Sequence, residues 1–191
     1  IISQSGALGF GMEQAIQRGV AVSHVLTSGN SCDVDMADYV AYLADEPACG
    51  AIALLFEGMA DPSRLLRACE YAAARNKPVI VCKIAVGAHG AAAAMSHTGS
   101  LAGSQAAYRA AFERAGVVLV DDLAAVMETA SFFAKAPPPK AAGIAVLATS
   151  GGAAIMAADA AEAHGLTLPQ PHPAAQAVLE ARIPEYGSAR N

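Results

Sequence analysis

The apolar positions along the chain fall into two kinds of run, short continuous ones and longer periodic ones. Residues 51–56 and 78–83 are continuous apolar runs of strand length, whereas residues 34–44, 62–75 and 123–134 have helical spacing. Strands that are apolar on both faces, with helices between them, are typical of a parallel sheet covered by helices on both sides. The pattern therefore predicts an α/β fold with three layers.

Shorter runs complete this pattern. We expect further strands at residues 1–2, 22–26 and 117–120, and further helices at residues 7–19 and 103–115. The small and polar residues between the strand at 78–83 and the helix at 103–115 predict a long, glycine-punctuated loop.

Proline residues interrupt the pattern at residues 135–141, because three consecutive prolines cannot continue a helix. The pattern then restarts with an expected strand at 143–148, a Ser/Gly turn, and a helix to about residue 164. We therefore expect a first domain at 1–134, a linker at 135–141, and part of a second domain at 142–191. The chain has no initiator methionine, and we expect it to be a piece of a longer protein.

Composition narrows the possible functions. Apolar residues make up 54% of the 191 residues, which is enough for a buried core. The net charge of −5 and the lack of a basic stripe argue against a nucleic-acid surface. No apolar run reaches the roughly 18–20 residues of a membrane span. The four cysteines fit no zinc pattern, so we expect free thiols in a cytoplasmic protein without a metal site.

Two similar turns each lie between an expected strand and an expected helix. They are Ser5-Gly6-Ala7 and Ser150-Gly151-Gly152. Such turns present free N–H groups and the positive end of a helix dipole, so they bind anions. Neither matches G-x-G-x-x-G or contains the P-loop lysine, so a single phosphoryl group is expected rather than a nucleotide. The alternative is an ordinary tight turn.

His97 is the candidate nucleophile. It lies among small residues in the expected loop, with Thr98, Gly99 and Ser100 as supporting groups. A neutral imidazole can attack phosphorus through one ring nitrogen when its other N–H is held by an acceptor. We therefore interpret His97 as a carrier of phosphate. His89, in the same expected loop, is a weaker rival.

Glu57 is the candidate acceptor for His97. It follows the apolar strand at 51–56, and a carboxylate at the carboxyl end of a core strand points into the catalytic crevice. The alternative is a solvated carboxylate. Asn30 follows the second expected strand and either caps a helix, shapes a turn, or contacts the site. The remaining histidines, His24, His164 and His172, are expected to be structural or exposed.

Several segments occur in an order that resembles the NDP-forming acyl-CoA synthetases, relatives of succinyl-CoA synthetase. The segments are Ser3–Gly9, Gly29-Asn30, Phe56–Gly58, Lys77–Val81, Ser96–Gly103 and Ser150–Gly152. The resemblance implies flavodoxin-like domains. It also implies a ligase that converts a carboxylic acid, ATP and CoA to acyl-CoA, ADP and phosphate through a phosphohistidine. His97 matches that histidine, and Glu57 matches the glutamate that supports it. The two Ser/Gly turns match the family's phosphate-binding helix N-termini.

The same resemblance implies parts that this chain does not contain. A CoA-binding Rossmann domain would precede Ile1, and an ATP-grasp domain that binds ATP or ADP with Mg would lie elsewhere on the chain or on a partner. The fragment alone is therefore expected to bind no cofactor tightly and not to turn over, and the protein is expected to be a homo- or hetero-oligomer. Residues 85–90 depart from the family's more charged run, which leaves the acyl substrate open.

Two other functions compete with the ligase. One is a non-catalytic or regulatory synthetase-like region of a protein acetyltransferase, which a fused acetyltransferase domain would favour. The other is an assembly domain that binds a partner through the crevice. Failure to bind phosphate at the two helix N-termini would favour the assembly function.

Overall fold

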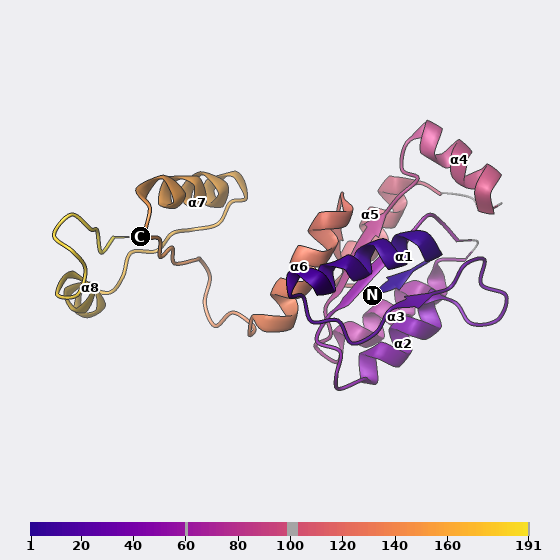
Figure 1. The fold of residues 1–191 in the computed structure, drawn as a ribbon, viewed down its shortest axis with the longest axis horizontal. Helices are drawn as coiled ribbons and strands as arrows, with labels where there is room; N and C mark the ends of the chain where they lie inside the picture. Colours follow the sequence, from indigo (N-terminus) through magenta and orange to yellow (C-terminus); the bar gives the residue numbers. More distant parts are fainter. Residues whose placement is uncertain (60, 99–102, 191) are drawn as a thin grey trace. The chain divides into compact units, whose positions relative to one another are not determined.

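The computed structural model describes residues 1–59, 61–98 and 103–190. The chain divides into two compact units, residues 1–137 (unit 1) and residues 138–191 (unit 2) (Figure 1). In the described part of the chain, no helix is both long enough and apolar enough to cross a membrane.

Unit 1 contains a parallel sheet of five strands. The strands are β1 (Ile2–Ser3), β2 (Leu26–Thr27), β3 (Ile52–Phe56), β4 (Val79–Lys83) and β5 (Val118–Val120), in the order β2-β1-β3-β4-β5. This is the strand order of flavodoxin-like doubly wound folds. The fold class predicted from the apolar runs is confirmed.

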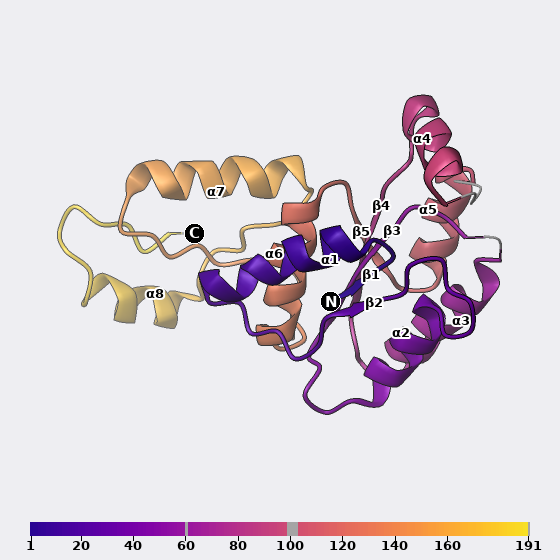
Figure 2. The same cartoon turned by 45° about the vertical axis from the view of Figure 1, so that its right-hand side comes forward.

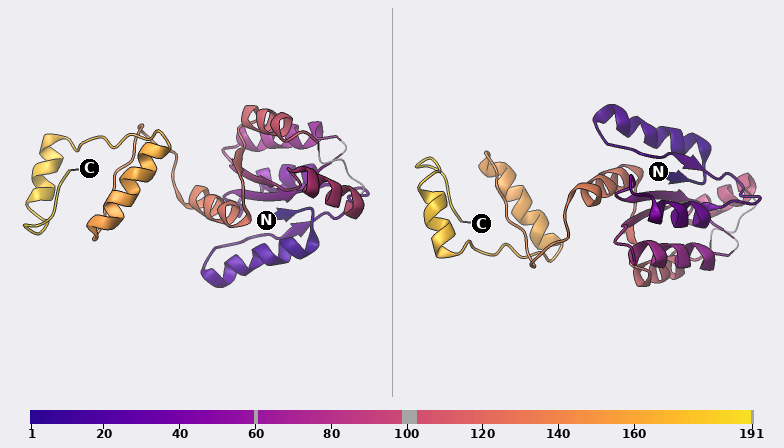
Figure 3. Two further views of the ribbon diagram at one scale, coloured as in Figure 1. Left: turned by 90° about the horizontal axis from the view of Figure 1, so that it is seen from above. Right: turned by 90° about the horizontal axis from the view of Figure 1, so that it is seen from below.

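The side chains of β3 show how the sheet separates two cores. Ile52, Leu54 and Phe56 pack into one core, and Ala53 and Leu55 pack into the other. Helices α2 (Met36–Asp45), α3 (Ser63–Ala73) and α5 (Gln105–Arg114) cover the first face, whereas α1 (Gly6–Glu13) and α6 (Leu123–Lys135) cover the second (Figure 2). Seen from above and below, the strands of unit 1 have helices on both sides (Figure 3). The predicted three layers are therefore present.

An aromatic cluster closes the core near the carboxyl end of β3. The Phe56 ring makes edge contacts with Tyr108 and Phe112 of α5, at centroid distances of 5.5 and 5.8 Å. Tyr108 and Phe112 stack on each other at 5.9 Å. All three side chains are buried, so the end of β3 is tightly packed.

The loop expected between β4 and α5 is wrong in part, because residues 88–98 form a helix, α4 (Ala88–Thr98). Four consecutive alanines, residues 91–94, have the highest helix propensity and outweigh the glycine at 90. Ala94 is buried, whereas the neighbouring alanines at 92 and 93 are exposed. The helix stands apart from the sheet in Figures 1 and 2.

Two other elements differ from the expected ones in unit 1. The second strand is only two residues long, and residues 22–25 are irregular. β2 lies at the edge of the sheet and pairs with β1 alone. The helix expected at 7–19 is divided into α1 and a 3-10 helix, η1 (Gln14–Arg18), which ends at Gly19 with a positive φ of 83°.

Unit 2 contains two helices, α7 (Gly151–Ala163) and α8 (Pro173–Glu180). The strand expected at residues 143–148 is wrong, since these residues are irregular. The Ile144 N–H donates to the Thr167 carbonyl at 3.0 Å, but residues 138–190 contain no ladder of paired strands. The expected helix to about residue 164 is confirmed, whereas α8 was not expected.

Candidate functional site

Successive strands are added on opposite sides of β1, so the connections from β1 and to β3 run in opposite directions across the sheet. The chain leaves β1 to form β2 on one side, then returns to form β3 on the other side of β1. Ile2 is in register with Leu54, and Ser3 with Leu55, so the segments after the two strands lie side by side. In open α/β sheets, ligands bind at such a switch point, outside the carboxyl ends of the strands.

Buried polar side chains gather at this switch point. Among the described residues, the buried polar or charged side chains are Ser3, Gln4 and Glu57, which are 0%, 8% and 9% exposed. Burying polar groups costs free energy unless they are hydrogen-bonded, so a cluster of them is more informative than any exposed apolar residue. The alternative of a solvated Glu57 carboxylate is therefore wrong.

Gln4 joins the two strand ends through its side chain. Its Oε1 accepts hydrogen bonds from the backbone N–H groups of Glu57 (2.8 Å) and Gly58 (3.4 Å). Its Nε2 donates to the carbonyl oxygen of Gly58 at 3.0 Å. Gln4 is a residue that sequence reasoning missed. Its only signal in the sequence was its place in the Ser3–Gly9 segment of the family resemblance.

The N-terminus of α1 opens at the same point. Ser5 is the N-cap, and its Oγ accepts a hydrogen bond from the Leu8 N–H at 3.4 Å. Gly6 and Ala7 follow in the first turn, where backbone N–H groups have no intrahelical partner. A Cβ placed on Gly6 would meet no atom within 4 Å, so the helix start is open. The Ser5-Gly6-Ala7 turn thus has the expected form of an anion site.

Lys83, the last residue of β4, supplies a cation next to Glu57. Its Nζ donates to the carbonyl oxygens of Glu57 (2.9 Å) and Ile84 (3.0 Å). The ammonium group lies 5.8 and 5.2 Å from the ring centroids of Phe56 and Tyr108. Burial lowers the pKa of Lys83 below its usual value. Sequence reasoning missed this residue, because only the sheet register brings it beside Glu57.

The expected position of His97 in a loop is wrong, because His97 is the last residue but one of α4. The side chains of His97 and Thr98, and the residues Gly99 and Ser100, lie outside the described part of the structure. The pairing of His97 with Glu57 therefore stays a prediction.

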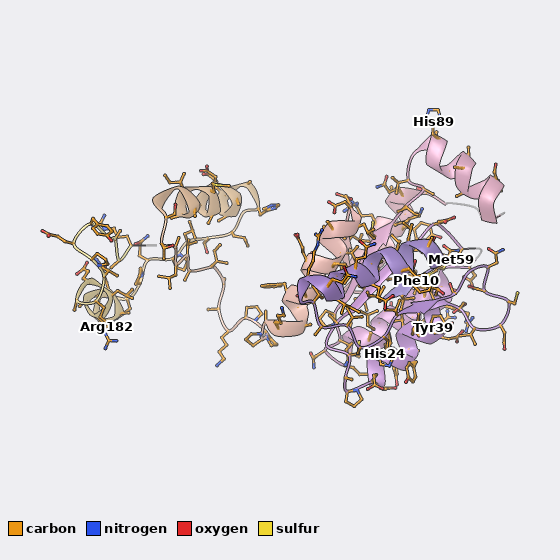
Figure 4. All side chains as sticks on the ribbon, viewed as in Figure 1. Phe10, His24, Tyr39, Met59, His89 and Arg182 are labelled. Atoms are coloured by element: carbon orange, nitrogen blue, oxygen red, sulfur yellow. The ribbon has the colours of Figure 1, made fainter. Side chains whose placement is uncertain are left out.

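The rival His89 lies at the other end of α4. It is exposed and points away from the sheet (Figure 4). Nothing described here brings His89 to the carboxyl ends of β1 and β3.

Asn30 is exposed in the turn that follows β2. Its neighbours Gly29 and Ser31 both have a positive φ, 55° and 54°. The cap of α2 is Asp35, which forms a capping box with Asp38. Asn30 is therefore a turn residue rather than a cap, and a contact with the site stays a prediction.

The second Ser/Gly turn opens α7 in unit 2. Ser150 is the N-cap, and its Oγ accepts from the Ala153 N–H at 3.5 Å. Gly151 and Gly152 are the first residues of the helix and are exposed. This turn also has the form expected of an anion site. His172 is the N-cap of α8 and His164 the C-cap of α7, which agrees with structural roles.

A parallel sheet in the order β2-β1-β3-β4-β5, with polar groups and a helix N-terminus at its switch point, defines a flavodoxin-like domain with a candidate anion site. Residues 1–133 match the family described as the succinyl-CoA ligase like flavodoxin domain. The chain belongs to this family, and the resemblance found in the sequence is confirmed.

Several proteins of known activity are similar to this chain. The alpha subunit of acetate–CoA ligase (ADP-forming) II from Pyrococcus furiosus is 36% identical over 191 residues, which are 100% of this chain and 41% of the subunit. Acetate–CoA ligase (ADP-forming) I from Archaeoglobus fulgidus is 39% identical over 168 residues, 87% of this chain and 24% of that enzyme.

A solved structure shows the same fold. The dinucleotide forming acetyl-coenzyme A synthetase 1 of Ca. Korarchaeum cryptofilum, in complex with phosphate and ADP, is 30% identical, with a TM-score of 0.89. The match covers 100% of this chain and 41% of that one. This chain thus spans less than half the length of the relatives that it matches.

Proposed function

We propose that this chain is the phosphohistidine-bearing part of an ADP-forming acyl-CoA ligase, with His97 as the residue that carries phosphate. The observation that carries the proposal is the buried carboxyl group of Glu57, beside the open N-terminus of α1 at the switch point. Similarity to ADP-forming acetate–CoA ligases supports the reaction class.

The roles follow from the chemistry of phosphoryl transfer. A ring nitrogen of His97 forms a bond to the γ-phosphorus of ATP while the bond from that phosphorus to the ADP oxygen breaks, and ADP leaves with the electron pair. Glu57 accepts the other ring N–H and stabilises the charged ring. The N–H groups of Gly6 and Ala7 bind the phosphoryl oxygens, and those of Gly151 and Gly152 are a second candidate set.

In a second transfer, a carboxylate oxygen of the acid forms a bond to the phosphorus while the bond from phosphorus to the His97 ring nitrogen breaks, and the electron pair returns to the ring. The thiolate of CoA then attacks the acyl carbon of the resulting acyl phosphate, and phosphate leaves with the electron pair of the broken carbon–oxygen bond. The sequence contains neither a dinucleotide fingerprint nor a P-loop lysine, so we assign the binding of CoA and of ATP with Mg to parts outside this chain. These parts are a Rossmann domain and an ATP-grasp domain, on the same polypeptide or on a partner subunit.

Labelling of the full-length protein tests the proposal. With ATP labelled in its γ-phosphate, the protein should acquire acid-labile label that is stable to alkali, as a phosphohistidine is. His97→Ala should abolish the label. His89→Ala is the matched control, since it removes an exposed imidazole from the opposite end of the same helix.

Label that persists in His97→Ala would contradict the proposal, as would label that is lost in His89→Ala. Absence of label in the wild-type protein, in the presence of the nucleotide-binding partner, would favour a regulatory function or an assembly function over the ligase.

A further inference from the structure

The backbone of Glu57 lies one residue beyond the hydrogen-bonded ladder of the sheet. The last backbone contacts of β3 are the Gln4 N–H to the Leu55 carbonyl (2.9 Å) and the Ile84 N–H to the Phe56 carbonyl (2.9 Å). Strand ends without further ladder contacts are the places where a sheet opens first. A functional carboxylate at residue 57 therefore needs another means of support.

Two side chains supply that support, one from each neighbouring strand. The Glu57 N–H donates to Gln4 Oε1 at 2.8 Å, and the Glu57 carbonyl accepts from Lys83 Nζ at 2.9 Å. Gln4 follows β1 and Lys83 ends β4, so the contacts approach Glu57 from opposite sides of β3. Both polar groups of the Glu57 backbone are thus held by side chains.

Both supporting side chains are themselves fixed. Gln4 is buried, and its amide also donates to the Gly58 carbonyl, so the hydrogen bonds of its side chain described above all go to Glu57 and Gly58. The Lys83 ammonium also bonds the Ile84 carbonyl and lies near the faces of Phe56 and Tyr108, where cation–π attraction restricts it.

We propose that Gln4 and Lys83 are positioning residues that clamp the Glu57 backbone and so hold its carboxylate in place for phosphoryl transfer at His97. This inference rests on the proposed function. Precise support of Glu57 affects the rate, because a shift of 1 Å in a positioned group can slow a reaction by about 100-fold. These two contacts use only backbone atoms of Glu57 and neither of its carboxylate oxygens.

The test measures the rate of phosphoenzyme formation in the full-length protein by rapid quench. Gln4→Met and Lys83→Met keep side-chain length and remove the hydrogen bonds. Each should slow phosphorylation by about 10- to 100-fold, whereas Lys83→Arg, which keeps the charge and the donors, should retain most of the rate.

Lys77→Met is the matched control for Lys83→Met. Lys77 also donates to two carbonyl oxygens, those of Glu46 and Cys49. It lies before the amino end of β4, whereas Lys83 lies at the carboxyl end. Its loss should lower stability without slowing phosphorylation. Slowing in Lys77→Met equal to that in Lys83→Met would overturn the inference, since it would reveal a general loss of structure.

A double-mutant cycle separates positioning from stability. In a Glu57→Gln background, adding Lys83→Met or Gln4→Met should cause little further loss of rate, because the group being positioned is already disabled. Fully additive losses would overturn the clamp. Wild-type rates in both single variants, with label still lost in His97→Ala, would overturn the clamp and leave the proposed function intact. Label that survives in His97→Ala would instead overturn the proposed function.

Discussion

At the scale of single residues, Glu57 combines a buried carboxyl group with a backbone that is bonded on both sides. A carboxylate held in this way can accept a hydrogen bond without first reorganising, which is the property that a histidine nucleophile requires of its partner. Among the residues whose side chains are described, Glu57 is therefore the one on which the proposed chemistry depends most.

Glu57→Gln tests this dependence. The amide has nearly the same shape but lacks the negative charge that stabilises the imidazolium formed during transfer. We expect phosphorylation of His97 to slow by roughly 100-fold or more, measured by rapid quench with labelled ATP. Circular dichroism should show an unchanged fold. A wild-type rate in this variant would show that Glu57 does not act on His97.

The four cysteines should differ sharply in reactivity. Cys32 is exposed, whereas Cys49, Cys69 and Cys82 are buried. Burial raises the pKa of the Cys69 thiol to about 12, and only the thiolate reacts with alkylating reagents. Iodoacetamide on the native protein at pH 8 should label Cys32 alone among these four, as peptide mass spectrometry would show.

Raising the pH should increase the alkylation of an exposed thiol but not that of Cys69. Because the pKa of Cys69 is raised in the folded state, an increase from pH 8 to about 9.5 speeds alkylation of an exposed thiol but leaves Cys69 protonated. Labelling of Cys69 that increases with pH in the same proportion as that of Cys32 would contradict the described packing.

At the scale of elements, continuous apolar runs were the most reliable signals. The runs at 51–56 and 78–83 became β3 and β4, buried along nearly their whole length. The run at 143–148 looked similar but formed no strand, because strand formation depends on a neighbour that no local pattern specifies. Helix α4 was missed because small residues are equally common in loops and in helices.

The candidate site, like the helices and strands, could be predicted only in part. Glu57 and the Ser5 turn follow from their positions after apolar strands. Gln4 and Lys83 could not be found in this way, because their contacts with Glu57 and Gly58 join residues far apart in the sequence. Such contacts exist only once the strand order is known.

Two glycines of α1 should respond oppositely to alanine. A Cβ on Gly9 would lie 2.8 Å from Thr27 Cγ2 and 3.3 Å from Ser3 Cβ, whereas a Cβ on Gly11 would meet nothing within 4 Å. Gly9→Ala should destabilise unit 1 by about 1–3 kcal/mol. Gly11→Ala should stabilise it by about 0.5–1 kcal/mol, because alanine favours the helix. Urea midpoints measure both. Equal midpoints would show that α1 does not approach β1 and β2 as described.

At the scale of the whole molecule, the chain consists of two units joined through a segment without regular structure. Residues 136–149 contain neither helix nor strand, and nearly all of them are exposed. One candidate anion site belongs to each unit, at the N-terminus of α1 in unit 1 and at the N-terminus of α7 in unit 2.

Limited proteolysis should locate this connection. Lys140 is exposed and is followed by Ala141, so trypsin can bind and cleave there, as it does in irregular exposed segments. Brief digestion of the full-length protein should produce a fragment that begins at Ala141, identified by N-terminal sequencing. Lys140→Gln should abolish that fragment. Resistance of wild-type Lys140 under conditions that cleave other loops would contradict the exposure described.

The strand order also determines when the candidate site can assemble during synthesis. Strand β1 is made first, yet it lies inside the sheet, and its partners for Ile2 are Leu26 and Leu54. Pairings between distant residues form slowly, because the intervening chain must first be ordered. Ser3, Gln4 and Ser5 therefore leave the ribosome before Gly58, so a nascent chain that ends before β3 contains only the part of the candidate site that follows β1.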